Sequence, residues 1–158
     1  MLGIGSGCVK LSTKGEYGLR AMYDLAELYG EGPISLKSVA ARQDISEPYL
    51  EQLFALLKKS GIVKSVRGAQ GGYTLSKEPR EITVGEVIYA LEGSFAPMDC
   101  VSTSNVEQCK RAEFCVTRQI WSKVKVAVDN VLDGITLQDM KDEAIKIRSG
   151  KDYYMYYI

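Results

Sequence analysis

Three of the four cysteines lie close together, at Cys100, Cys109 and Cys115, with spacings C-x8-C and C-x5-C. Free cysteines usually pack as small buried apolar residues, but polar and charged residues surround these three. Thiols clustered at such spacings are typical of metal ligands or of redox chemistry. The sequence therefore predicts a functional loop at 93–114, and Cys8 is left out of this site.

The charges are distributed unevenly along a chain of 158 residues, a length typical of one domain. The formal net charge is zero, yet the stretch from Gln52 to Lys77 holds five basic residues and no acidic one. A local basic surface of this kind suits a nucleic-acid partner even when the whole chain is neutral. We expect a double-stranded DNA operator as partner, with neither a membrane nor a small-molecule substrate.

No apolar run approaches the roughly 18 residues of a membrane span. Residues 1–9 lack the basic region and the long apolar stretch of a signal peptide, so we interpret them as an extension or tag. The expected compartment is the cytoplasm, where thiols stay reduced, which favours a metal site or redox switch over structural disulfides. An enzyme is not expected, because the chain has no histidine, no nucleophile motif and no phosphate-cradling loop.

Apolar periodicity and capping residues predict three helices at Thr13–Tyr29, Leu36–Gln43 and Glu47–Ser60. Ser35 and Ser46 are the predicted caps of the second and third helices. Two β-rich runs, 62–66 and 73–75, flank a glycine-dense connection and indicate a hairpin. Three helices followed by a basic-tipped hairpin define a winged helix-turn-helix over 10–92, whose third helix would enter the major groove.

The remaining chain continues the helical pattern on both sides of the cysteine loop. Thr83 and Glu86 form a capping box that opens a helix to about Glu92. A long helix, Cys115–Asp133, carries an apolar seam that needs a partner, so we predict that it mediates homodimer formation. Thr136 would cap a final helix to about Ile147, which gives a dimerisation segment at 115–149 and a tail at 150–158. The predicted fold is mostly α with a small β wing.

Four segments, 10–22, 45–54, 66–73 and 84–88, closely resemble the IscR/NsrR-type winged-helix transcriptional regulators. The resemblance covers the chain from Lys10 to about Ile147. It implies a dimeric bacterial regulator that senses iron-sulfur status through a cluster held by three cysteines. We expect a [2Fe-2S] cluster rather than a [4Fe-4S] cluster, with zinc as the alternative ligand of the same residues.

The resemblance also assigns DNA contacts. The residues that it places toward the major groove are Pro48, Tyr49, Glu51 and Gln52. Glu51 matches the glutamate with which IscR-type regulators tune their choice between two classes of DNA site, and Arg67 matches the wing residue that reaches the minor groove. A further basic set would either contact phosphates or form a solvated face: Lys58, Lys59 and Lys64.

The ligands depart from the family pattern in two ways. IscR-type regulators have five residues in both gaps between the cysteines, whereas the first gap here has eight. Where those regulators have a histidine ligand, this chain has Arg118. NsrR-type relatives instead use an acidic residue of the partner subunit's first helix, which matches Glu16. Because the chain has no histidine, we expect Glu16 to be the fourth ligand. The alternatives are that Glu16 is only a first-turn acid favoured by the helix dipole, or that the ligand is Asp99, Glu107 or Glu113.

The resulting hypothesis is a regulator, of repressor type, that controls iron-sulfur cluster biogenesis genes. One alternative is a nitric-oxide or redox-sensing regulator of the same family. Another is a regulator of cysteine metabolism controlled by zinc or by a reversible disulfide.

Overall fold

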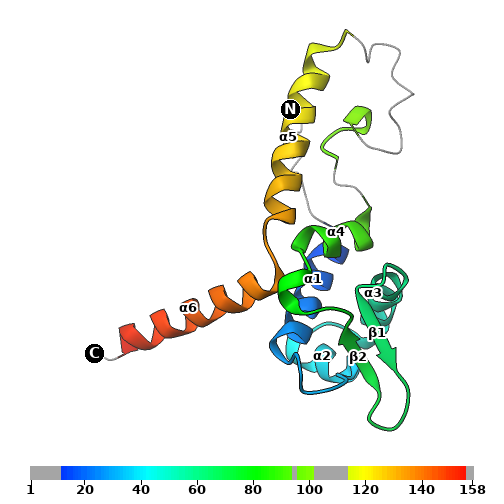
Figure 1. Ribbon diagram of the computed structural model, residues 1–158, viewed down its shortest axis with the longest axis vertical. Helices are drawn as coiled ribbons and strands as arrows, with labels where there is room; N and C mark the ends of the chain where they lie inside the picture. The colour runs from blue at the N-terminus through cyan, green and yellow to red at the C-terminus, as the bar shows by residue number, and fades with distance from the viewer. Residues whose placement is uncertain (1–11, 94–95, 102–113, 156–158) are drawn as a thin grey trace, which may run out of the picture.

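The computed structural model describes residues 12–93, 96–101 and 114–155, with the side chains of residue 99 and residues 150–155 left aside. This part of the chain is mostly helical, with one two-stranded sheet, as predicted (Figure 1). The elements follow in the order α1 (Thr13–Glu27), α2 (Leu36–Gln43), α3 (Glu47–Lys59), β1 (Val63–Val66), β2 (Gly72–Leu75), α4 (Val84–Glu92), α5 (Val116–Asp133) and α6 (Leu137–Met155), with 3-10 turns η1 (Pro79–Glu81) and η2 (Asp99–Val101).

Side-chain caps start most of these helices. Ser12 caps α1, Ser35 caps α2, and Thr83 opens α4 in the predicted capping box. Ser46 occupies the predicted N-cap position of α3, but its hydroxyl makes no hydrogen bond to the first turn. Pro48 in that turn has a backbone angle already suited to a helix, so α3 begins without the side-chain cap.

Helices α1 to α4 and the hairpin share one apolar core, whose fully buried side chains include Phe54, Met22, Leu25, Leu50, Leu53 and Leu57. The hairpin closes on α3 through Phe54 and Tyr73, whose rings meet edge to face at 4.8 Å. Strands β1 and β2 are antiparallel, and an isolated bridge from Ile34 to Tyr73 extends the sheet toward α2. A Cβ on Gly72 would lie 2.3 Å from the Ile34 carbonyl oxygen, so this close approach requires glycine.

Helices α5 and α6 leave the core in different directions (Figure 1). The carboxyl end of α5 is attached to α4, where the Tyr89 hydroxyl donates to Asp129 at 2.9 Å. Helix α6 is attached to α1 by the pair of Arg148 with Glu27 at 2.6 Å, and it runs to Met155, beyond the predicted end at Ile147. Within the described ranges no helix is long and apolar enough to cross a membrane.

Candidate DNA-binding face and cysteine site

Helix α3 separates its buried and exposed residues as a recognition helix requires. One face buries the leucines and Phe54 in the core, while the predicted groove residues Pro48, Glu51 and Gln52 are exposed. The Glu51 carboxylate can accept a hydrogen bond from a cytosine amino group, and the neighbouring Gln52 amide can bind adenine. Three of the four predicted readers are therefore free to face a groove.

Tyr49, the fourth predicted reader, is half-buried and packs against the first helix. Its ring meets that of Tyr17 edge to face, with centroids 6.0 Å apart. The Arg20 guanidinium lies over the other ring, 5.3 Å from the Tyr17 centroid. Tyr49 therefore links the amino end of α3 to α1 in addition to any contact with DNA.

A hollow of about 560 Å³ lies at the turn before α3, lined by Thr13, Tyr17, Asp44, Ile45, Ser46 and Tyr49. It adjoins the amino ends of α1 and α3. Because no side chain caps α3, its first-turn N–H groups are donors that suit a DNA phosphate.

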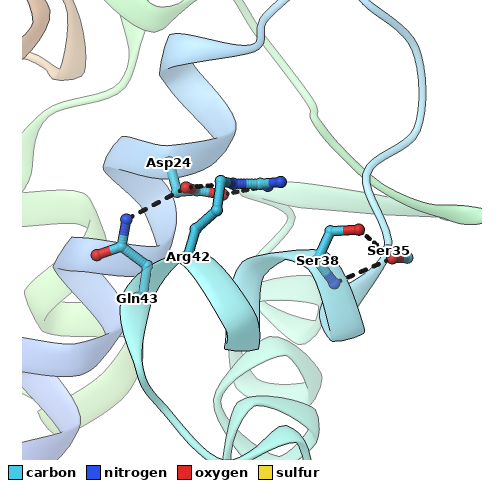
Figure 2. A network of polar contacts seen from close by, with 5 residues as sticks. All are labelled: Asp24, Ser35, Ser38, Arg42 and Gln43. Atoms are coloured by element: carbon cyan, nitrogen blue, oxygen red, sulfur yellow. Dashed lines mark hydrogen bonds and ion pairs between the residues drawn. The ribbon is translucent and has the colours of Figure 1, made fainter.

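A polar network between α1 and α2 fixes the helix-turn-helix (Figure 2). The carboxylate of Asp24 is 3% exposed and accepts from Arg42 at 2.8 and 2.6 Å and from Gln43 at 3.2 Å. The hydrogen bond to Asp24 raises the pKa of Arg42 above its usual value. Arg20 also donates to the Gln43 carbonyl. This network was not predicted from the sequence, although a lone aspartate on the apolar face of α1 was the signal.

The wing presents Arg67 to solvent at the start of the β1–β2 turn. Gly68 has a φ of +123°, a conformation that favours glycine, and its carbonyl accepts from the Gly71 N–H at 2.9 Å. The predicted phosphate contacts Lys58, Lys59 and Lys64 are also exposed. The first two lie in the last turn of α3, where the helix dipole favours cations whether or not DNA is bound.

Of the two described cysteines, Cys100 lies within the predicted loop at 93–114, and Cys115 directly follows this loop. Cys100 belongs to η2 and Cys115 is the residue directly before α5, and both thiols are half-exposed. The Thr117 hydroxyl lies 3.1 Å from the Cys115 sulfur, and its hydrogen bond, helped by the Arg118 N–H, lowers the pKa of this thiol. Cys109, Glu107 and Glu113 fall outside the described residues.

Glu16 is exposed in the first turn of α1. Within one chain α1 lies in the core, whereas the amino end of α5 projects away from it (Figure 1). In a single chain the structure thus separates α1, the helix that carries Glu16, from the amino end of α5, which directly follows Cys115. Among the described residues no group of three or more cysteine, aspartate or glutamate side chains is placed to hold a metal. The thiols nevertheless fit the donor chemistry of an iron-sulfur cluster, because thiolate is its usual ligand.

A winged helix-turn-helix with an exposed recognition helix and a basic wing defines a DNA-binding transcriptional regulator. Comparison with known families agrees: the chain belongs to the Rrf2 family, described as iron-dependent transcriptional regulators, whose model matches residues 11–143.

The similar proteins include regulators named CymR and regulators named IscR. CymR of Bacillus subtilis (strain 168), an HTH-type transcriptional regulator, is 44% identical over 150 residues, which cover 95% of this chain and 100% of CymR. Its solved structure, described as the global cysteine regulator, has 46% identity and a TM-score of 0.70 and covers 85% of this chain and 97% of its own. The solved structure of T. potens IscR has 56% identity and a TM-score of 0.70, covering 85% and 88%. These relatives are regulators and not enzymes, as expected.

Proposed function

We propose that this protein is a homodimeric transcriptional repressor that senses iron-sulfur status in the cytoplasm and controls cluster biogenesis genes. Its cluster ligands would be Cys100, Cys109 and Cys115, with Glu16 supplied by the partner subunit. The observation that carries the proposal is the placement of two half-exposed thiols at the junction of η2 with the amino end of α5. The 56% identity to T. potens IscR supports the same assignment.

The chain's own residues prepare this site for a thiolate-bound group. The lowered pKa of Cys115 increases its thiolate fraction, and thiolate is the form that binds metal. A bound cluster supplies a redox-active group held mainly by sulfur. An oxygen ligand from Glu16 would be more easily exchanged than sulfur or nitrogen, which suits a sensor.

The apolar seam of α5 supports the homodimer. No residue of α5 is buried within the single chain, and Val116, Ile120 and Val131 are 70%, 55% and 59% exposed. A helix with such a seam needs an apolar partner, and a second copy supplies one with two-fold symmetry. Two recognition helices related by this symmetry suit a palindromic operator.

A path of contacts leads from Glu16 to the recognition helix. Glu16 precedes Tyr17, whose ring supports Tyr49 at the amino end of α3. Ligation of Glu16 by the partner's cysteine site would act on the position of α1, and hence on that of α3. Gain or loss of the ligand would thus alter the DNA-binding face.

The test is anaerobic purification followed by Mössbauer and EPR spectroscopy, with DNA titrations of holo and apo protein. We expect a coloured protein whose cluster content falls in the Glu16→Ala variant and not in the Glu31→Ala variant, which removes an equally exposed acid beyond the end of α1. Colourless protein with stoichiometric zinc would contradict the cluster, and unchanged occupancy in Glu16→Ala would contradict the fourth ligand.

A second candidate is a regulator of cysteine metabolism without a cluster. The match over the whole length of CymR supports it, and the low-pKa thiol of Cys115 would then be the residue oxidised to a disulfide. Mass spectrometry after mild peroxide treatment would reveal that disulfide in metal-free protein. Loss of DNA binding after exposure of the holo protein to nitric oxide would instead favour the nitric-oxide sensor.

A further inference from the structure

Arg118, in the first turn of α5, contacts both described cysteines. Its Nε donates a hydrogen bond to the Cys100 carbonyl oxygen at 3.1 Å. After the Thr117 hydroxyl, the backbone N–H of Arg118 and the charge of its side chain also contribute to the lowered pKa of the Cys115 thiol. One residue therefore joins the η2 turn to the start of α5, although residues 101–114 separate the two cysteines in sequence.

We infer that Arg118 is a positioning residue of the cysteine site, which holds Cys100 beside Cys115 and supplies the positive charge that an all-anionic set of ligands requires. The inference rests on the proposed function, because it concerns the same ligands. It assigns a role to a residue that is not itself a ligand.

The positioning role follows from the chain between the cysteines. Bringing two residues of a chain together costs entropy that increases with the number of residues between them. A hydrogen bond at the base of the loop holds the two ends together before any ligand binds. Arginine suits this task, because its planar guanidinium is half-buried here and can bind a carbonyl oxygen in a fixed orientation while still presenting charge.

The charge role follows from the ligands. Three thiolates and one carboxylate are all anionic, so they repel one another when they converge on a single site. The guanidinium of Arg118 contacts the backbone of Cys100. In sequence, Arg118 lies three positions after Cys115. A cation in a partly desolvated position acts more strongly than one at the surface.

The test uses Co²⁺ alone as the probe, titrated anaerobically into apo protein and followed by the thiolate-to-cobalt charge-transfer absorbance. Arg118→Ala removes both the hydrogen bond and the charge, whereas Arg118→Lys keeps the charge and Arg118→Gln keeps an amide donor. The matched control is Lys123→Gln, which removes an exposed charge from the same helix. Circular dichroism checks that every variant retains its helices.

We expect Co²⁺ affinity to fall about tenfold or more in Arg118→Ala, as for other residues that orient metal ligands, to fall less in Arg118→Lys, and to stay unchanged in Lys123→Gln. Reconstituted clusters should have a lower midpoint potential in Arg118→Gln than in Arg118→Lys. Equal affinities of wild type and Arg118→Ala, including equal failure to bind Co²⁺, would overturn the inference. A wild type that holds no cluster but binds Co²⁺ through Arg118-dependent thiols would refute the proposed function and leave the inference standing.

Discussion

The carboxylate of Glu92 caps the amino end of α1: its Oε1 accepts a hydrogen bond from the backbone N–H of Gly15 at 2.8 Å. The same oxygen accepts from the Ser12 hydroxyl at 2.8 Å. A negative charge at this end of α1 also interacts favourably with the helix dipole. Glu92 is the last residue of α4 and directly precedes the segment that contains the cysteines. This contact therefore ties that segment to the helix that supports Tyr49.

Replacing Glu92 by alanine should lower the free energy of unfolding by about 2 kcal/mol, because two hydrogen bonds to a charged acceptor are lost. Urea denaturation measures this loss. Glu143→Ala is the control, since Glu143 is exposed on α6 and pairs with Lys146 in the same helix, and its effect should stay within about 0.5 kcal/mol. Equal stability of the Glu92 and Glu143 variants would refute the capping role.

The pair of Asp24 and Arg42 should be strongly coupled. Arg42→Met leaves the buried Asp24 carboxylate with Gln43 alone among the donors in its network, so we expect a loss of about 2 to 3 kcal/mol. Adding Asp24→Asn to this variant removes the uncompensated charge and should recover part of the loss. A double variant no more stable than Arg42→Met would contradict the assignment of the cost to that charge.

The winged helix-turn-helix was predictable because local signals determine it. Periodicity and caps predicted the bounds of α2 and α4 correctly and those of α3 within one residue. Contacts between distant residues were not predictable, because Asp24 with Arg42 and Glu92 with Gly15 depend on how helices pack. The same limit applies to the site: spacing singled out Cys100 and Cys115, but no pattern placed Arg118 between them or Tyr49 against Tyr17. Helix α6 also runs past its predicted end to Met155, through Gly150, a residue type that often ends a helix.

Tyr89 should make stability depend on pH in the alkaline range. Burial, followed by its hydrogen bond to Asp129, raises the pKa of Tyr89 to about 12 from an ordinary value of 10.0. Below pH 10 both folded and unfolded states keep the proton, so this residue contributes no pH dependence. Between about pH 10 and pH 12 the unfolded state loses its proton first, and stability falls as pH rises. Urea midpoints of wild type and Tyr89→Phe should therefore converge over this range; a constant difference would contradict the raised pKa.

Arg67→Ala should weaken operator binding by about tenfold and reduce the slope of log affinity against log salt by about one, because one fewer cation enters the negatively charged minor groove and fewer counterions are released. Fluorescence anisotropy at several salt concentrations measures both quantities. Lys77→Ala is the matched control, because it removes the same charge outside the wing. Lys77 follows the end of β2 and pairs with Glu86 at 3.5 Å. An identical loss in both variants would mean that net charge, and not the wing, determines the effect.

The exposed seam of α5 predicts that Ile120→Glu converts the protein to a monomer. Ile120 is 55% exposed in the single chain, so the substitution should cost the isolated fold only about 0.5 kcal/mol. In a dimer the same side chain would place an uncompensated charge in an apolar interface, which is far more costly. Sedimentation equilibrium should therefore show half the wild-type mass. The variant should also bind a palindromic operator more weakly than the wild-type protein does. Gln119→Glu adds the same charge on a different face of α5 and should remain dimeric. A dimeric Ile120→Glu would exclude this seam as the interface and leave the two-fold symmetry without its structural basis.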